Sequence, residues 1–323
     1  MMRMKRIAVL RGGPSEEYDV SMLTGKAVLE ALAASEYRPK DIMISKTGQW
    51  FDQGRKRTPD QALEGVDVVF IALHGTFGED GQVQRILERK RIPFTGSPSL
   101  TSGIAFNKEL TKQTMRQHKI HMAKHRRVNR DEKDTLQDEV AQIIADLGTE
   151  LFIKPLSNGS SFGARRVLET AELYDNLVEL LDLYDSLLVE EYIGGTEATV
   201  GVLSDFRGER LYALPTIEIV PPTTDSFYTS ANKYDGTSDH ICPGRFSPAV
   251  KSEMSRIAQL AHIEVGCDQY SRSDFLVRGN DVYFLEINTL PGFTSESNYP
   301  IAANAIGLDF KQLVQHLINT ARV

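Results

Sequence analysis

Hydrophobic positions in the first hundred residues form short continuous runs, separated by longer stretches that fit a helix. The runs at residues 6–10, 40–45 and 67–73 predict strands, since short apolar runs bounded by turn residues are typical of buried strands. Residues 21–33 predict an amphipathic helix, and residues 81–89 predict another. Strands that alternate with helices in this way are typical of an α/β fold with a parallel sheet.

The middle of the chain continues the alternation, and the last third changes character. After a boundary at Gly96-Ser97-Pro98-Ser99 and a helical stretch with Lys108, strands are predicted at 124–128, 151–154 and 164–168, and helices at 134–147 and 170–183. From residue 187 onward the pattern is mostly strands, with helices at 247–265 and 310–320. A long polar segment at 221–246 interrupts it. Within a compact domain such a segment is usually a functional lid or disordered.

Residues 271–292, SRSDFLVRGNDVYFLEINTLPG, predict a β-hairpin with a face of polar side chains. If Gly279, Asn280 and Asp281 form a three-residue loop, Asp274 stands opposite Glu286, because side chains on one face recur at every second position. A two-residue loop would place these two carboxylates on opposite faces. With the longer loop, Arg272 and Asn288 join the carboxylates, and the other face collects the apolar residues Phe275, Val277, Tyr283, Leu285 and Ile287.

The polar face of this hairpin has the composition of a site for a hard cation. Asp274, Glu286 and Asn288 offer oxygen ligands without cysteine or histidine, which suits Mg²⁺ better than zinc. Mg²⁺ bound in this way usually completes its coordination shell with oxygens of substrate phosphates. The alternative is a hairpin with a few charged residues at its edge.

Composition and charge exclude several classes of protein. The chain has 323 residues, enough for two or three domains, and its 41% hydrophobic and 25% charged content is ordinary for a globular protein. A formal charge of −7 provides no basic field for nucleic acid. The longest apolar run, 68–73, is far below the roughly 20 residues that cross a bilayer, and residues 7–10 are too short for a signal-peptide core. Cys242 and Cys267 are too few for a disulfide framework, so a reducing cytoplasm is expected.

The usual phosphate-binding motifs, G-x-G-x-x-G and G-x-x-x-x-G-K-[ST], do not occur in the sequence. Instead, the strand ending at Lys154 runs into the small-residue loop Pro155–Gly163, whose N–H groups can surround an anion. The same loop contains G-S-S-F-G, which matches a nucleophile elbow with Ser161 as nucleophile. That motif requires a helix directly after the serine, whereas residues 164–168 predict a strand. A plain structural loop also remains open.

Polar side chains follow several other predicted strands. The strand at 187–192 ends in Glu190 and Glu191, with Glu197 close behind, where an exposed hairpin or an adenine and ribose site would both fit. Glu17 follows the glycine-rich end of the first strand, where ligands bind open α/β sheets, and a carboxylate there can pair with a substrate ammonium. The first turn of a helix also favours acids without any function. His74 begins a second glycine-rich segment.

The remaining candidates are a group of histidines and two residues of the polar segment. His118, His121 and His125 have no Cys or acidic companions in register and are interpreted as solvated surface. Lys233 and Tyr234 are either loop residues or, in a lid, groups that reach the reacting atoms.

Taken together, these motifs resemble the D-alanine–D-alanine ligases of the ATP-grasp superfamily. The resemblance runs nearly end to end, in the segments GGPSEEYDVS, ALHGTFGEDG, GSPSLTSGIAFNKELTK, IKPLSNGSSFG, VEEYIGGTEATVGVL, NKYDGTSDHICP, SRSDF and LEINTLPGFTSES. It implies three α/β domains, α+β overall, with ATP held between the second and third. The expected domains are 1–100 with the parallel sheet, 101–187, and 188–323 with the metal site and a lid at 221–246.

The resemblance also implies a role for each matching residue. Lys108, Lys154 and Ser161 would bind the ATP phosphates, Glu190, Glu191, Tyr192 and Ile193 would line the adenine pocket, and Glu197 would hold the ribose. Asp274, Glu286 and Asn288 would bind two Mg²⁺, with Mn²⁺ as a substitute. Glu17 and His74 would receive the first D-alanine, and Lys233 and Ser297 the carboxylate of the second. Ser160 and Tyr234 would link the lid to Glu17, and Arg272 with the N–H of Gly292 would form an oxyanion hole.

The implied activity is ATP-dependent ligation of two D-alanines through an acyl phosphate, for peptidoglycan precursors, by a cytoplasmic homodimer. Asn298 departs from the family pattern, in which many relatives have an apolar residue beside the second-substrate pocket, and residues 229–232 are less acidic than expected. A different amino-acid or hydroxy-acid acceptor is therefore the alternative, although Tyr234 favours an amine. A nucleotide-binding module without turnover is a further alternative.

Overall fold

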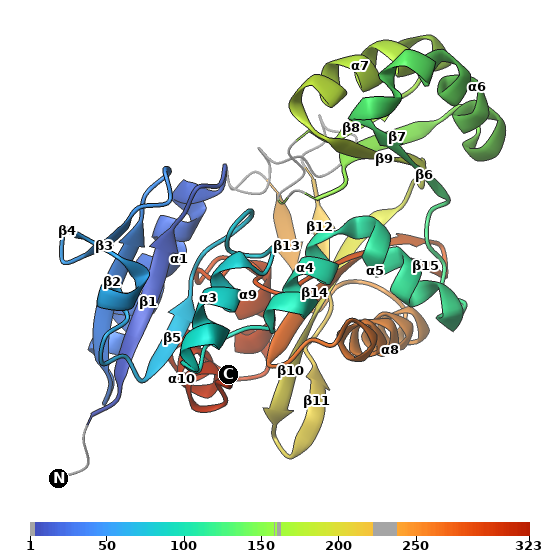
Figure 1. Ribbon diagram of the computed structural model, residues 1–323. Helices are drawn as coiled ribbons and strands as arrows, with labels where there is room; N and C mark the ends of the chain where they lie inside the picture. The colour runs from blue at the N-terminus through green and yellow to red at the C-terminus, as the bar shows by residue number, and fades with distance from the viewer. Residues whose placement is uncertain (1–3, 158, 160–162, 222–237) are drawn as a thin grey trace.

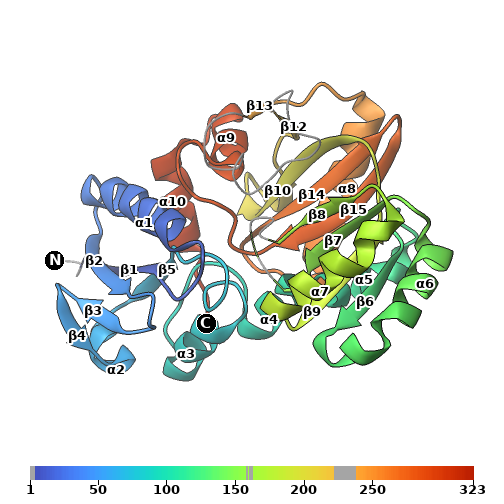
Figure 2. The same ribbon diagram turned by 90° about the horizontal axis from the view of Figure 1, so that it is seen from above.

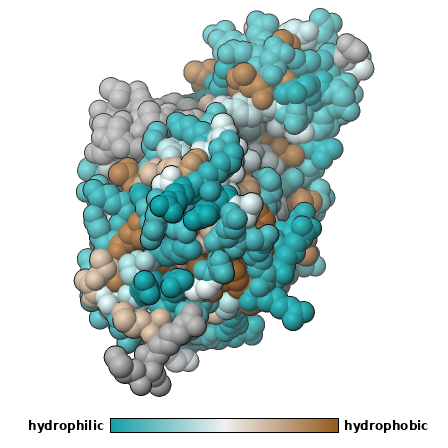
Figure 3. All heavy atoms as spheres, turned by 60° about the vertical axis from the view of Figure 1, so that its left-hand side comes forward, coloured by the Kyte–Doolittle hydropathy of each residue, from teal (hydrophilic) through white to brown (hydrophobic). Residues whose placement is uncertain are grey.

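The computed structural model describes residues 4–157, 159, 163–221 and 238–323. Figure 1 shows three sheets, one at each side of the molecule and one between them, and Figure 2 shows the same arrangement from above. Hydrophilic side chains dominate the face seen in Figure 3, where the hydrophobic ones are scattered. The mixed α/β class predicted from the sequence is confirmed.

The first sheet has the strand order β4-β3-β2-β1-β5 and combines parallel with antiparallel pairs. Strand β1 (Arg6–Gly12) pairs in parallel with β2 (Arg38–Ile44) and β5 (Val68–Ile71), as predicted. A hairpin of β3 (Trp50–Asp52) and β4 (Arg55–Arg57) extends one edge antiparallel. The hydrophobic pattern did not predict this hairpin, because strands of three residues contain too few positions to show an alternation. The helices of this unit are α1 (Tyr18–Ala33), α2 (Pro59–Ala62) and α3 (Gln82–Lys90).

The second sheet is small and antiparallel, with the order β6-β9-β7-β8. It contains β6 (His125–Asn129), β7 (Leu151–Pro155), β8 (Arg165–Val167) and β9 (Ser186–Glu191), and the helices α6 (Leu136–Leu147) and α7 (Leu173–Leu183) cover it. The loop after Lys154 therefore leads into strand β8 and not into a helix. The helix required for a serine nucleophile elbow does not follow, and that alternative is excluded on the described residues.

The third sheet is the largest and has the order β13-β12-β10-β14-β15, with β11 beside β10. Its strands are β10 (Thr196–Phe206), β11 (Glu209–Ala213), β12 (Ile217–Val220), β13 (Asp239–Ile241), β14 (Tyr270–Arg278) and β15 (Asp281–Asn288). Helix α8 (Pro248–Val265) packs on one face together with α4 (Ser99–Phe106) and α5 (Lys108–Met115). The chain ends with α9 (Asn298–Ala305) and α10 (Phe310–Asn319).

The β14–β15 hairpin confirms one prediction and corrects another. Asp274 is opposite Glu286, and Arg272 is opposite Asn288, as expected. The connection, however, is a two-residue turn, because Arg278 pairs with Asp281. An irregularity between Asp274 and Phe275 restores the register by leaving Leu285 as an extra residue, which is a β-bulge.

The bulge also changes which side chains of β15 enter the core. The core receives Val282 and Phe284, together with the predicted Phe275, Val277 and Ile287. Tyr283 and Leu285 are only half-buried, which corrects their expected place in that face. The reversal follows from the pleat, since one extra residue moves every later side chain to the other face.

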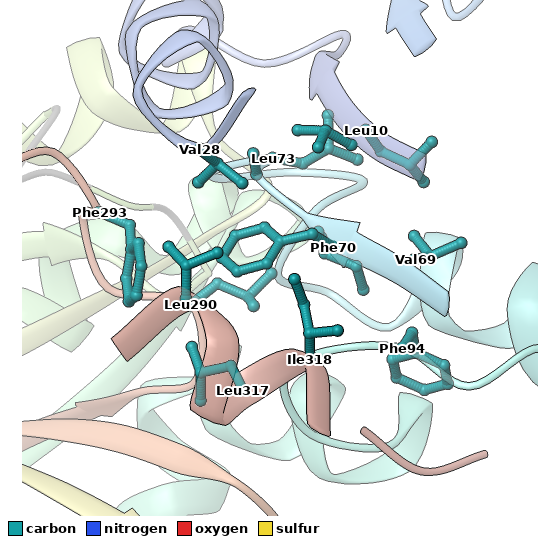
Figure 4. Close-up of a cluster of buried hydrophobic side chains, with 14 of the residues drawn as sticks. Leu10, Val28, Val69, Phe70, Leu73, Phe94, Leu290, Phe293, Leu317 and Ile318 are labelled. Atoms are coloured by element: carbon teal, nitrogen blue, oxygen red, sulfur yellow. The ribbon is translucent and has the colours of Figure 1, made fainter. Parts of the chain in front are cut away.

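The apolar cores cross the boundaries expected between domains. Figure 4 shows Leu317 and Ile318 of α10 packed against Phe70 of β5, so the end of the chain completes the core of the first sheet. Ala105 of α4 and Met115 of α5 likewise belong to the core of the third sheet. The division into 1–100, 101–187 and 188–323, with a lid at 221–246, stays a prediction.

Candidate active site

A cleft of about 1120 Å³ lies where the three sheets meet, and residues from all three line it. Residues 160–162 and 222–237 are not described, so Ser160, Ser161, Lys233 and Tyr234 lie outside the described residues. Every other residue for which the family resemblance implied a role lines this cleft: Glu17, His74, Lys108, Lys154, Glu190, Glu191, Tyr192, Ile193, Glu197, Arg272, Asp274, Glu286, Asn288, Gly292 and Ser297. The histidines interpreted as surface, His118, His121 and His125, do not line it. Candidates far apart in the chain thus belong to one site.

The polar face of the β14–β15 hairpin forms one wall of the cleft. Arg272 donates from Nε and Nη2 to the two oxygens of Asp274, both at 2.8 Å, and Asp274 also accepts from Thr199 Oγ1 at 2.7 Å. The ammonium of Lys108 is 3.2 Å from Glu286 Oε2. Each carboxylate therefore faces a cationic side chain at the wall of the cleft.

These donors fit a hard divalent cation. Asp274 and Glu286 are partly exposed, so a cation could reach them from the cleft, and Asn288 adds an amide oxygen. Among the described residues, no group of three or more His, Cys, Asp or Glu side chains is arranged to hold a metal. Two carboxylates and an amide leave room in the coordination shell for oxygens of a substrate, as Mg²⁺ sites commonly do.

A buried cluster of charges lies at the floor of the cleft. Glu190 is 2.5 Å from the ammonium of Lys112 through Oε1 and 2.7 Å from that of Lys154 through Oε2. Burial opposes the ionisation of Glu190, but the two lysines outweigh it and lower its pKa to about 2. The pKa of Lys112 is lowered by burial, since Glu190 compensates only in part and Lys154 repels it. The pKa values of Glu190 and Lys112 can both be lowered in this buried cluster because one carboxylate interacts with two ammonium groups: the carboxylate gains two favourable partners, and each lysine has only a share of one.

The sequence analysis missed Lys112, although a signal was present. Lys112 follows Lys108 by four positions on α5, so the two lysines share one face of that helix. Its partner Glu190 comes from the second sheet, and no local pattern connects the two residues.

The segment predicted to hold adenine, residues 190–193, has apolar surroundings, and two of its backbone N–H groups donate hydrogen bonds within the protein. The N–H of Glu191 donates to Lys124 O at 3.0 Å and that of Tyr192 to Glu150 O at 2.9 Å, so neither amide faces a ligand. The guanidinium of Arg166 stacks 3.8 Å from the centre of the Tyr192 ring. Several apolar side chains line this part of the cleft and offer the walls that a purine needs: Ala123, Phe152, Ile193, Leu276 and Leu285.

His74 and Glu79 form a buried pair at the end of the cleft next to the first sheet. His74 Nδ1 donates to Leu290 O at 3.1 Å, since a carbonyl only accepts, and Nε2 contacts Thr24 Oγ1 at 2.9 Å. Burial would lower the pKa of His74, but hydrogen bonding and charge from Glu79, and the charge of Glu17, raise it. Burial raises the pKa of Glu79. Glu79 lies in the glycine-rich segment identified from the sequence, which was the available signal for it.

Glu17 lies between two stretches of backbone that contain glycine. A Cβ added at Gly75 would be 2.8 Å from Glu17 Oε2, and one added at Gly159 would be 2.2 Å from it. Gly159 belongs to the loop after β7, so the carboxylate of Glu17 meets that loop at close range. Both positions need the absence of a side chain for this approach.

Ser297 and a polar pair lie in the part of the cleft beside Gly292. Ser297 Oγ accepts from Thr294 N at 3.1 Å and is 2.9 Å from Thr294 Oγ1, close to Gly292. The imidazole of His240 hydrogen-bonds with the side-chain oxygen of Asn298. Both residues line the cleft. The sequence analysis had singled out Asn298 but not His240, which lies 58 positions away.

The buried carboxylate of Glu218 and the guanidinium of Arg245 form an ion pair that also lines the cleft. Glu218 accepts from Arg245 at the backbone N, Nε and Nη2, at 2.8, 3.0 and 2.7 Å. The side-chain hydrogen bond with Arg245 lowers the pKa of Glu218. This pair ties β12 to the segment before α8, and neither residue was predicted.

Comparison with known proteins identifies the family. The model of the D-ala D-ala ligase N-terminus matches residues 6–62 and 52–97, and the model of the D-ala D-ala ligase C-terminus matches residues 114–319. A D-alanine–D-alanine ligase from Carboxydothermus hydrogenoformans is 35% identical over 316 residues, which cover 97% of each chain.

Solved structures agree with these matches. VanG D-Ala:D-Ser ligase from Enterococcus faecalis has a TM-score of 0.83 at 30% identity, covering 98% of this chain and 99% of its own. D-alanine–D-alanine ligase from Bacillus anthracis, complexed with ATP, has a TM-score of 0.77 at 27% identity, covering 98% and 97%. No helix in the part of the chain that the structure describes is long and apolar enough to cross a membrane. With both terminal models matched and relatives aligned over its whole length, this chain belongs to the D-alanine–D-alanine ligase family, whose members are ATP-dependent ligases.

Proposed function

We infer that the protein joins two D-alanine molecules, with conversion of ATP to ADP and phosphate, and so supplies the dipeptide for peptidoglycan synthesis in the cytoplasm. One observation carries this conclusion. A single cleft combines the oxygen donors of the hairpin, the lysine ammonium groups and the buried carboxylate of Glu17. These are the groups that a nucleotide, its cation and an amino-acid ammonium each require.

The first step must activate a carboxylate, which is a poor electrophile. The carboxylate of the first D-alanine attacks the γ-phosphorus of ATP, the bond to the bridging oxygen breaks, and an acyl phosphate and ADP result. Lys108 and Lys154 would hold the phosphates in line. Asp274, Glu286 and Asn288 would hold Mg²⁺, which when bound neutralises charge on the transferring phosphoryl group. We propose two such ions, with Mn²⁺ as a substitute.

The second step forms the peptide bond. The amine of the second D-alanine, after losing a proton, attacks the acyl carbon, and phosphate leaves. Arg272 and the N–H of Gly292 would stabilise the oxyanion that develops, because fixed donors are effective where charge appears in the transition state. Glu17, with His74 beside it, would pair with the ammonium of the first D-alanine.

Several residues would complete the site. Glu190, Glu191, Tyr192 and Ile193 would surround the adenine, with Glu197 at the ribose and Ser161 at the phosphates. Lys233 and Ser297 would receive the carboxylate of the second D-alanine, and Ser160 and Tyr234 would link the lid to Glu17. A lid at 221–246 would exclude water, which otherwise hydrolyses the acyl phosphate. We also propose that the protein is a homodimer.

The deciding experiment is ADP release with Mg²⁺-ATP and a panel of D-alanine, L-alanine, D-serine and D-lactate, with the products identified by mass. We expect release that requires D-alanine and yields its dipeptide. A mixed product with another acceptor would keep the mechanism and move the acceptor specificity to Asn298 and His240. Tight ATP binding without release in any mixture would overturn the proposed activity and favour a nucleotide-binding module.

A further inference from the structure

Lys112 is the most deeply buried charge at the floor of the cleft, and the mechanism above leaves it without a role. Its side chain is 1% exposed, and its ammonium lies 2.5 Å from Glu190 Oε1 and 3.1 Å from Ala123 O. Glu190 and Lys154 line the cleft, whereas Lys112 does not. Lys112 therefore lies behind the wall of the cleft, next to Glu190, and does not itself line the cleft.

The three residues form a line of alternating charge with an excess of one positive charge. Glu190 binds one lysine with each carboxylate oxygen, so its own charge is shared between two cations. Burying an ammonium costs several kcal/mol even when it is paired. A cluster built only to hold α5 against β9 would need one lysine and one glutamate, and the second lysine adds charge and desolvation cost without improving that contact.

We infer that Lys112 is a positioning residue for the nucleotide phosphates, because it neutralises Glu190 and leaves the charge of Lys154 available to an anion in the cleft. The inference rests on the proposed function, in which Lys154 contacts ATP. Without Lys112, Lys154 and Glu190 form a neutral pair, and the phosphates meet no net charge there.

The test compares ligands that differ only in phosphate. Dissociation constants of ATP and of adenosine are measured by calorimetry on the full-length protein at a fixed Mg²⁺ concentration. In Lys112→Met we expect ATP to bind roughly tenfold or more weakly, the size expected for loss of one nearby charge, with adenosine changed much less. The KM of ATP should rise in parallel and that of D-alanine should not. Lys26→Met removes an exposed lysine that pairs with Glu30 and is the matched control.

A second variant separates charge balance from structure. In Lys112→Met/Glu190→Gln the unbalanced carboxylate is gone, Lys154 again carries one net charge, and the ratio of ATP to adenosine affinity should return toward that of the wild type. Equal loss of ATP and adenosine affinity in the single variant, or a ratio that the second substitution does not restore, would show that Lys112 only supports the fold. If Lys112→Met does not fold, Lys112→Gln and its double variant with Glu190→Gln answer the same question.

The inference and the proposed function fail separately. A wild-type protein that binds ATP but makes no dipeptide contradicts the function and leaves the binding comparison valid. A wild-type protein that makes dipeptide, with an unchanged affinity ratio in Lys112→Met, contradicts the inference alone.

Discussion

At the scale of single residues, the cleft is organised as pairs of opposite charge. Asp274 pairs with Arg272, Glu286 with Lys108, and Glu190 with two lysines. A nucleotide with its bound cation brings both signs of charge to these pairs. The cation can bind the carboxylates while the phosphates bind the basic side chains, so no buried charge is left without a partner. Substitution of one member therefore affects its partner as well.

Glu286→Gln is expected to reduce turnover by at least about 100-fold, because it removes one of two anionic ligands from the proposed Mg²⁺ site. The Mg²⁺ concentration for half-maximal rate should rise. Thermal stability should change little, since the side chain is 30% exposed. Steady-state assays across a Mg²⁺ series would measure both effects.

Glu296→Gln is the matched control, because Glu296 also lines the cleft but is exposed and lies outside the hairpin. Normal turnover in Glu286→Gln, or an equal loss in both variants, would contradict the metal assignment.

Arg272→Ala should slow formation of the peptide bond by roughly 10²–10³-fold, the usual effect of losing one oxyanion donor. The first step should be less affected, so acyl phosphate should still form and be trapped as a hydroxamate by hydroxylamine. Arg272→Lys keeps the charge beside Asp274 without the two-pronged contact and separates loss of the oxyanion donor from loss of the partner of Asp274. Dipeptide formation at the wild-type rate in Arg272→Ala would exclude this role.

Asn298→Leu should change the preference for the second substrate. The amide of Asn298 and the imidazole of His240 give the Ser297 end of the cleft a polar wall, to which a hydroxyl side chain can hydrogen-bond. Loss of one such bond corresponds to a factor of up to about ten. We expect the ratio of kcat/KM for D-serine to that for D-alanine to fall by this factor, and an unchanged ratio would place the acceptor side chain elsewhere.

At the scale of elements, the sequence predicted the pairing of Asp274 with Glu286 correctly, although it predicted the wrong length for the turn of the hairpin. The sequence predicted the pairing of Asp274 with Glu286 from a three-residue loop, and the structure reaches the same pairing with a two-residue turn and a bulge at Leu285. Alternation along each strand determined which side chains share the cleft. It could not place the bulge, because an extra residue in the loop and an extra residue in the strand shift the register equally.

The turn after β1 depends on glycine in a way that can be measured. Gly12 has φ +92°, and a Cβ there would lie 2.2 Å from Ile44 O, whereas Gly48 has φ +75° with nothing within 4 Å. Gly48→Ala should lower the free energy of unfolding by roughly 1–2 kcal/mol through backbone strain alone. Gly12→Ala should cost roughly 1–3 kcal/mol more, because the overlap is with backbone.

Urea unfolding followed by circular dichroism would measure both substitutions, and Gly12→Ala should also weaken D-alanine binding by moving the start of α1 and Glu17. Equal destabilisation of the two variants would show that the close approach to Ile44 has no energetic weight.

At the scale of the whole molecule, cores and hydrogen bonds join parts that the sequence presents separately. His262 of α8 is 1% exposed and contacts Ser271 Oγ through Nδ1 at 2.8 Å and Asp268 O through Nε2 at 3.2 Å. Because a carbonyl only accepts, Nε2 carries the proton and Nδ1 accepts from the serine. Burial lowers the pKa of His262 from 6.5 to about 4.

Stability should therefore fall as the pH falls from 6.5 to 4, because in this range the unfolded chain binds a proton at His262 and the native protein does not. The full effect corresponds to about 3 kcal/mol. His262→Gln should show a smaller loss of stability than the wild type across this range, as measured by urea unfolding at several pH values. The contribution of Glu190, with its pKa lowered from 4.5 to about 2, is lost at lower pH, between these two values. Identical pH dependence in wild type and variant would contradict the assignment to His262.

The sequence by itself determined most of the order of strands and helices, the glycine-rich turn after β1 and the polar residues that share one face of the β14–β15 hairpin, since these depend on local periods and turn chemistry. Its motifs were also sufficient to indicate the family. Only the tertiary structure decided the bulge at Leu285, the pairing of Lys112 with Glu190, the contact of His240 with Asn298 and the packing of α10 against the first sheet. Each of these joins segments distant in sequence or depends on how two strands settle against each other, and such contacts arise from burial and close packing, which leave no periodic signal along the chain.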